Sequence, residues 1–192
     1  MSSRRVFIGI DVSEEARAAA SQHIQELRRT AADVRVSWEK PEKLHVTLEF
    51  LGNVDDAALR DLSEELALVA AKTNSFTADL LGPGVFPNVR QPRILWLGIE
   101  NDAGVMKDVV ASVENVCSRF GFQRERRTFS PHVTIGRIRE PQKGRGLAER
   151  HLEMGFDAVT FDVDELVVYE STLSPTGSAY KAVRRFRLRR PG

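Results

Sequence analysis

The sequence contains the pattern His45-Val46-Thr47-Leu48 and repeats it as His132-Val133-Thr134-Ile135, 87 positions further along the chain. Both copies lie in runs rich in β-branched and large apolar residues, which predict extended strands. Because side chains alternate between the two faces of a strand, the histidine and the threonine of each copy share one face. The valine and the leucine or isoleucine share the other face, which can pack on helices. Each copy is therefore expected to present one imidazole and one hydroxyl on the exposed side of a sheet.

The rest of the chain predicts further helices and strands. Ser13 and Asp55 are expected to cap two of the helices. The segment Gly82–Arg93 contains three prolines and two glycines, so it is expected to be an exposed loop. Helices are expected over 13–29, 55–72 and 102–120, with a short helical turn over 146–152, and strands over 6–10, 34–38, 44–51, 76–81, 94–99, 132–139, 157–163, 165–173 and 180–187.

The order of these elements predicts the fold class. In each half of the chain helices flank strands, and each half holds one copy of the repeated pattern. This order indicates an α+β fold with mainly antiparallel strands. We expect one domain over residues 1–192, built as two lobes of related architecture.

Composition limits the range of functions. The 28 lysines and arginines are balanced by 27 acidic residues, which excludes a strongly basic scaffold. The single cysteine, Cys117, is expected to fill the core, and a free thiol fits a reducing compartment such as the cytoplasm. No stretch is long and apolar enough to span a bilayer, so no membrane association is expected. A monomer is expected, because each apolar helix face has an evident use within the chain.

If the two lobes face each other, two imidazoles and two hydroxyls meet in one cleft. In-line displacement at a phosphodiester needs one group that takes a proton and another, on the opposite side of phosphorus, that gives one. Imidazole has an unperturbed pKa of about 6.5, so two histidines supply both forms near neutral pH. The hydroxyls of Thr47 and Thr134 can donate hydrogen bonds to non-bridging phosphate oxygens. This chemistry requires no metal ion and no cofactor.

The repeated pattern has two other interpretations. Its histidines and threonines can be ordinary strand residues. A metal site is the second alternative, because alternation places Glu49 on the face of His45 and Thr47, and Phe50 on the opposite face. Threonine is a poor ligand for zinc, and neither a His-x-x-x-His pattern nor a cysteine cluster accompanies the pair, which disfavours a metal site.

With their flanking residues, the two patterns resemble the two-histidine phosphoesterases. Within that superfamily the sequence is similar to the RNA 2′,3′-cyclic phosphodiesterases, the bacterial and archaeal proteins first described as 2′-5′ RNA ligases. The resemblance runs nearly from end to end, and it is carried by residues 5–10, 40–52, 91–98, 129–137 and 171–173, together with Gly177 and Tyr180.

The resemblance implies a bilobal fold with a water-filled cleft between pseudo-symmetric lobes. It implies hydrolysis of a 2′,3′-cyclic phosphate at an RNA end to a 2′-phosphate, with weak reverse joining of ends through a 2′-5′ linkage. It also implies that His45 protonates the departing O3′ and that His132 is the base that activates water. The sequence leaves the direction open, because either histidine can serve as the base if the substrate binds inverted.

The resemblance further implies that Arg137 helps to hold the phosphate. Strict alternation places Arg137 on the face opposite His132, so it can reach the phosphate only through a bulge or twist at Gly136. A salt bridge behind the strand is the alternative role.

Other basic and aromatic residues are candidates for RNA contact. Trp38 and Phe86 can stack on a terminal base or can be packing residues. His23 and His151 lack a matching threonine and are expected at the surface. Two sets of arginines can track an RNA backbone, and the second of them can instead protect a charged edge strand: Arg124, Arg126 and Arg127, and Arg185, Arg187 and Arg189.

Two alternative functions stay open at this stage. One is a non-catalytic protein that binds RNA ends on the same scaffold, although both histidines and both threonines are intact. The other keeps the catalysis but acts on a small cyclic nucleotide.

Overall fold

The structure is a computed structural model that describes residues 3–31, 33–101, 104–123, 128–174 and 177–190. In chain order its elements are β1 (Ser3–Asp11), α1 (Glu14–Thr30), β2 (Val36–Trp38), η1 (Pro41–Lys43), β3 (His45–Asp55), α2 (Asp56–Lys72), β4 (Phe76–Phe86), β5 (Ile94–Glu100), α3 (Val105–Arg119), β6 (His132–Ile138), η2 (Pro141–Lys143), α4 (Arg145–Met154), β7 (Val159–Val163), β8 (Glu165–Ser174) and β9 (Gly177–Arg187).

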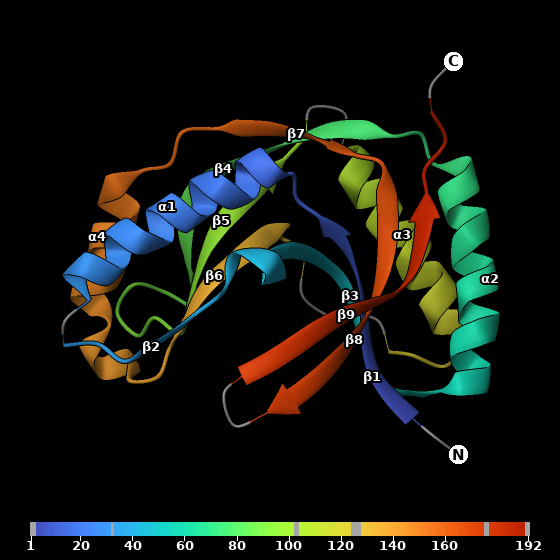
Figure 1. Cartoon of the computed structure of the whole chain (residues 1–192), viewed down its shortest axis with the longest axis horizontal. Coiled ribbons are helices and arrows are strands. Elements are labelled where there is room, and N and C mark those ends of the chain that lie inside the picture. The colour runs from blue at the N-terminus through green and yellow to red at the C-terminus, as the bar shows by residue number, and fades with distance from the viewer. Residues whose placement is uncertain (1–2, 32, 102–103, 124–127, 175–176, 191–192) are drawn as a thin grey trace.

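Within the described residues, the strands form one curled antiparallel sheet. Its order is β7-β4-β5-β6-β3-β1-β8-β9, and β2 pairs with β6 beside this path. Helices α1 and α4 pack on one half of the sheet, whereas α2 and α3 pack on the other half, as Figure 1 shows. The predicted α+β class with mainly antiparallel strands is confirmed.

The sheet divides at its centre into two lobes. The β3 lobe contains β3, β1, β8 and β9 with helices α2 and α3, and the β6 lobe contains β2, β6, β5, β4 and β7 with helices α1 and α4. The chain repeats the order strand, helix, strand, helix, first as β1, α1, β3, α2 and then as β5, α3, β6, α4. Because α1 packs in the β6 lobe and α3 in the β3 lobe, each lobe takes elements from both halves of the chain.

The helix caps follow the sequence closely. The Ser13 hydroxyl accepts a hydrogen bond from the backbone N–H of Ala16, and the Asp55 carboxylate accepts from Ala57 and Ala58. Both predicted caps are confirmed. Residues 145–154 form a complete helix, α4, where the sequence predicted only a short turn.

The expected loop over Gly82–Arg93 is shorter than predicted, because β4 continues to Phe86. Pro83 is tolerated because the pairing with β5 shifts register between Leu81 and Pro83, so the ladder there does not follow the regular pattern. At Gly84 the indole ring of Trp96 lies against the bare backbone. Pro83 therefore marks a register shift within strand β4, and Gly84 provides a packing site for Trp96 in the same strand.

Each copy of the repeated pattern contains a bulge at its fourth residue. Pairing with β1 skips Leu48, and pairing with β5 skips Ile135. The predicted alternation therefore reverses after these positions. Glu49 is buried, with 6% of its surface exposed, while Phe50 is 51% exposed. The placement of Glu49 on the histidine face was wrong, because strict alternation cannot anticipate a bulge.

The prediction that His23 and His151 lie at the surface was also wrong. Both are buried, with His23 Nε2 lying 2.9 Å from His151 Nδ1. His151 Nε2 donates to the carbonyl of Trp96 at 3.1 Å, so its Nδ1 accepts from His23. The pair joins α1 and α4 to the sheet. Cys117 is buried in the core as predicted, and burial raises the pKa of its thiol to about 12.

The contact between Gly84 and Trp96 generates a test of stability. A Cβ atom at position 84 would lie 2.1 Å from the Trp96 ring. We expect Gly84→Ala to lower the free energy of unfolding by about 1–3 kcal/mol, because the ring must move in a packed site. The control is Gly146→Ala, since a Cβ atom at that position in α4 meets no atom within 4 Å. Urea denaturation of both variants measures the difference, and an equal effect of the two substitutions would contradict the proposed clash.

The buried histidine pair predicts that stability falls in mild acid. Burial and, to a smaller extent, the neighbouring His23 lower the pKa of His151 to about 4. Between this value and the ordinary pKa of about 6.5, the unfolded chain binds a proton that the folded chain does not. Stability is therefore retained above about pH 6.5, and falls by on the order of 2 kcal/mol between about pH 7 and pH 5.

Denaturation of the double variant His23→Gln/His151→Gln tests this pH dependence. Glutamine amides can keep hydrogen bonds at both positions but do not titrate. We expect the variant to lose less stability than the wild type over the same pH interval. Parallel curves for the two proteins would show that the pair does not carry the acid sensitivity.

Candidate active site

The two copies of the repeated pattern meet where the two lobes join. Val46 of β3 and Val133 of β6 form the antiparallel bridge between these strands, and both are fully buried. The register of this bridge sets His45 opposite Thr134, and Thr47 opposite His132. All four side chains project from the face opposite the valines and line one cleft of about 490 Å³. The predicted convergence of two imidazoles and two hydroxyls is therefore present.

His45 is held by hydrogen bonds on both ring nitrogens. Its Nδ1 donates to the carbonyl of Lys43 at 2.6 Å, because a carbonyl oxygen can only accept. In the neutral ring Nε2 therefore carries the lone pair, and the Thr47 hydroxyl donates to it at 3.0 Å. Nε2 is the nitrogen available to a substrate in the cleft.

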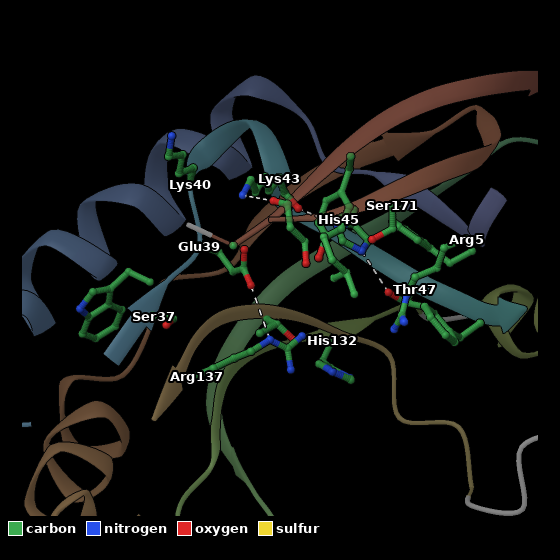
Figure 2. Close-up of a pocket in the computed structure, with 18 of the residues that line it drawn as sticks. Arg5, Ser37, Glu39, Lys40, Lys43, His45, Thr47, His132, Arg137 and Ser171 are labelled. Carbon is green, nitrogen blue, oxygen red and sulfur yellow. Dashed lines mark hydrogen bonds and ion pairs between the residues drawn. The ribbon is translucent and has the colours of Figure 1, made fainter. Parts of the chain in front are cut away.

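His132 repeats this arrangement in the other lobe. Its Nδ1 donates to the carbonyl of Ser130 at 2.7 Å, two residues before it, as Lys43 is two residues before His45. Its Nε2 is therefore also the lone-pair nitrogen of the neutral ring. Figure 2 shows the two imidazoles on opposite sides of the cleft, one from each lobe.

Burial lowers the pKa of both histidines below the ordinary value. The hydrogen bonds from the rings to backbone carbonyls act in the opposite direction. The nearby charges differ between the two sites: Asp11 raises the pKa of His45 while Arg17 and Arg137 lower it, and Arg137 lowers the pKa of His132. The two imidazoles are thus related by position but lie in different electrostatic surroundings.

Arg137 reaches the cleft because of the bulge at Ile135. The bulge turns Gly136 inward with Ile135 and brings Arg137 to the face of His132. The predicted alternative of a salt bridge is present as well, but it lies in the cleft: Arg137 Nε is 3.6 Å from Glu39 Oε1. Figure 2 shows this pair beside His132.

The cleft is strongly positive. Among its described lining residues are five lysines and arginines but a single carboxylate, which is Glu39. Lys43 also ties the cleft to the β8–β9 hairpin, because its ammonium donates to the carbonyl of Ser178. The cationic residues are Arg5, Lys40, Lys43, Arg137 and Arg139. This charge suits an anionic ligand.

Aromatic rings support both imidazoles, and the sequence did not single out most of them. His45 contacts Phe7 and Tyr180, with ring centroids 4.8 Å and 5.2 Å away. Phe86, a predicted base-stacking candidate, is instead 5.1 Å from the His132 ring and supports it. Trp38, the other candidate, lines the cleft.

A carboxylate behind His45 was also missed by the sequence analysis. Asp11 accepts hydrogen bonds from Tyr169, from Arg17 at 2.9 Å and from Arg185 at 2.8 Å. Burial alone would raise the pKa of Asp11, but these partners lower it below its ordinary value. Asp11 is paired with His45 in the β1–β3 register, so a fixed negative charge lies beside that imidazole.

The two predicted sets of arginines have different outcomes. Arg124, Arg126 and Arg127 lie outside the described residues. In the C-terminal set, Arg185 and Arg187 pair with Glu165, and Arg189 donates to Asn74 at 2.8 Å. Glu165 lies on β8, which pairs with the edge strand β9, so the pairs of Arg185 and Arg187 fit the charged-edge alternative.

The alternative metal site would need Glu49 as its third ligand. Glu49 is buried and does not line the cleft, so it cannot join the two histidines there. Among the described residues there is no cluster of three or more side chains of the kinds that hold a metal ion. None of the described helices is long and apolar enough to cross a membrane.

A curled antiparallel sheet that presents two His-x-Thr strands to a cationic cleft defines a two-histidine phosphoesterase. The family described as LigT-like phosphoesterase matches this sequence twice, over residues 10–96 and 97–180. The two matches start 87 positions apart, as do the two histidines, so each match contains one copy of the motif. The chain belongs to this family.

Named relatives and solved structures agree with this assignment. An RNA 2′,3′-cyclic phosphodiesterase of Thermotoga maritima is 37% identical over 93% of this chain and 92% of that protein. One of Methanothermobacter thermautotrophicus is 32% identical over 96% of this chain and 98% of its own length. A crystal structure from Thermus thermophilus has the same fold, with a TM-score of 0.80 and 23% identity over 98% of this chain and all of that chain. Apo LigT of E. coli gives a TM-score of 0.70 and 22% identity over 98% of this chain and 99% of that chain.

Proposed function

We propose that this protein is an RNA 2′,3′-cyclic phosphodiesterase that opens the cyclic phosphate by metal-independent acid and base catalysis. The observation that carries the proposal is the convergence of the two His-x-Thr motifs about the Val46–Val133 bridge, in a cleft with five cationic side chains. The relatives named for this activity match nearly the whole chain, which supports the same substrate class here.

The proposed base is His132. Its neutral ring offers the Nε2 lone pair to the cleft, because Nδ1–H is engaged by the Ser130 carbonyl. In the reaction Nε2 takes a proton from water as the water oxygen forms a bond to phosphorus. The rings of Phe86 and Trp96 fix the imidazole in this orientation.

The proposed acid is His45, which gives its Nε2 proton to O3′ as the P–O3′ bond breaks. The product is then a 2′-phosphate beside a free 3′-hydroxyl, and the two protonation states are restored by transfer through solvent. Burial lowers the pKa of both rings; at His45 the charge of Asp11 raises it, while Arg17 and Arg137 lower it. The Asp11 carboxylate, paired with His45 in the β1–β3 register, places a negative charge beside this ring and supports it as the histidine that carries the proton.

The phosphate is proposed to lie between the two motifs, held by Thr47, Thr134 and Arg137. In the charged ring of His45, Nε2 carries a proton and no longer accepts a hydrogen bond from Thr47. The Thr47 hydroxyl is then free to donate to a non-bridging oxygen. Thr134 is its counterpart in the other motif. The Arg137 guanidinium supplies positive charge where the developing negative charge lies.

The same proposal extends to the organisation of the protein. We propose that residues 1–192 act as one bilobal domain and as a monomer, with RNA carrying a 2′,3′-cyclic phosphate end as the partner. The unpaired thiol of Cys117 supports a reducing compartment such as the cytoplasm. Weak reverse joining of RNA ends through a 2′-5′ linkage follows from the reversibility of the two proton transfers.

Hydrolysis of a short oligoribonucleotide with a 2′,3′-cyclic phosphate end tests the function. We expect the wild type to release a 2′-phosphate end in excess EDTA. His45→Ala and His132→Ala should each lower kcat by about a hundredfold to ten-thousandfold, because each removes one proton-transfer group. Chromatography of the products against 2′- and 3′-phosphate standards identifies the isomer.

Thermal melts and RNA binding provide the controls. Both variants should fold, and should bind the same oligonucleotide as the wild type does. Undiminished turnover in either variant would exclude the two-histidine mechanism. A wild type that binds the cyclic end but does not open it would instead favour the RNA-end binding alternative, and loss of activity in EDTA would exclude metal independence.

The lowered histidine pKa values predict a pH optimum on the acid side. Activity needs one neutral and one charged imidazole, so kcat/KM of the free enzyme peaks between their two pKa values. Because burial lowers both values, we expect the maximum below about pH 6.5, the unperturbed value. A bound phosphate anion stabilises the charged ring, so the kcat profile should extend to higher pH than that of kcat/KM. Steady-state kinetics across pH test both expectations, and a kcat/KM maximum on the alkaline side of neutrality would contradict them.

A further inference from the structure

A second groove adjoins the cleft and has no part in the mechanism above. It lies between the C-terminal end of α1, strand β2 and the end of β6. Ser37, Trp38 and Arg139 line both hollows, so the groove and the cleft adjoin at these residues. The groove adds the side chains of Arg28 and Arg35, both of which are exposed.

The guanidinium groups of the groove are available to a ligand. No ion pair of Arg28, Arg35 or Arg139 is formed among the described residues. Arg139 donates to the Ser37 hydroxyl at 2.8 Å, which fixes its position at the boundary with the cleft. This contrasts with Arg185, Arg187 and Arg189, whose partners are acidic or amide side chains.

The carboxylate that lines the groove forms an ion pair within the chain. Glu140 is the carboxylate among its described lining residues, and its Oε1 lies 2.9 Å from Lys143 Nζ. The groove therefore presents three uncompensated positive charges to solvent. Such a surface suits a ligand that carries several negative charges at intervals, as a nucleic acid backbone does.

Trp38 lies where the two hollows meet. Its indole ring packs on the bare backbone of Gly136, because a Cβ atom there would approach the ring within 3.0 Å. The ring stays partly exposed and lines both hollows. A flat aromatic surface between two cationic hollows can stack an unpaired base while the arginines hold the phosphates on either side.

The two ends of the cleft differ, and the groove adjoins one of them. In Figure 2, Ser37 lies at one end of the cleft, and Arg5 and Ser171 lie at the other, with the histidines between them. At the Arg5 end the lining includes Phe50, an exposed apolar side chain whose ring centroid lies 4.8 Å from the Arg5 guanidinium. Among the described residues, the positively charged groove adjoins the Ser37 end.

We propose that the groove binds the single-stranded RNA that precedes the cyclic phosphate, with Trp38 stacking on a base, and Arg28, Arg35 and Arg139 contacting backbone phosphates. This inference rests on the proposed function and narrows it, because it makes an RNA chain, rather than a cyclic mononucleotide, the preferred substrate. The mononucleotide fills the cleft but leaves the groove empty.

The test compares two substrates, 2′,3′-cyclic AMP and a tetra-adenylate that ends in a 2′,3′-cyclic phosphate. The wild type should have the higher kcat/KM on the tetranucleotide. The variant Arg28→Gln/Arg35→Gln should lower the ratio of tetranucleotide to mononucleotide kcat/KM by about tenfold, as expected for two lost phosphate contacts. The loss should lie in KM, and the dependence of log KM on log salt for the tetranucleotide should weaken by about 1.4, because each contact to single-stranded RNA contributes about 0.7.

The matched control is Arg29→Gln, which removes an exposed arginine from the same turn of α1 but outside the groove. It should keep the wild-type ratio. A double variant with the wild-type ratio would overturn the proposal, and so would a control that lowers the ratio as much as the double variant. A wild type that opens both substrates equally well overturns the groove's role alone, whereas a wild type that opens neither overturns the proposed function and the groove together.

Discussion

The pairing of Val46 with Val133 is the constraint on which the rest of the structure depends. It is the bridge that joins β3 to β6, and so joins the two lobes at the centre of the sheet. Because side chains alternate about it, burying the two valines turns two histidines and two threonines to the opposite face. The position of the reactive groups is thus a consequence of core packing. A site built on strands in this way is held more rigidly than one built on loops.

The sequence predicted this centre well, because the repeated pattern contains both the buried and the exposed side chains of the strand. It also predicted the α+β class, both helix caps and the burial of Cys117. It failed where the backbone departs from a regular period. The bulge at Leu48 exchanges the faces of Glu49 and Phe50, and a period of two cannot anticipate an inserted residue. The bulge at Ile135 brings Arg137 into the cleft, which is the kind of departure that the sequence analysis required for this residue to reach a phosphate.

Other errors arose from contacts between residues that are far apart in the chain. His23 and His151 each resemble surface residues in their local sequence, but in the core they form a hydrogen bond with each other. Asp11 was not identified as part of the site because its partners, Arg17, Tyr169 and Arg185, meet only after the sheet has formed. Gly84 was assigned to a loop because its local sequence is rich in proline and glycine. Its role depends on the ring of Trp96, which belongs to the next strand. In each case the missing information was a long-range pairing and not a local preference.

The exchange of elements between the lobes affects how the chain reaches this structure. Strand β1 pairs with β3 on one side and with β8 on the other, and β8 follows it by more than half the chain. Helix α1 likewise rests on β7 and α4, which come late in the sequence. During synthesis the first motif therefore emerges long before its lobe can close. Contacts of such high sequence separation slow folding and leave apolar surface exposed meanwhile. The arrangement that makes the two lobes inseparable also means that neither half of the chain can be expected to fold when expressed alone.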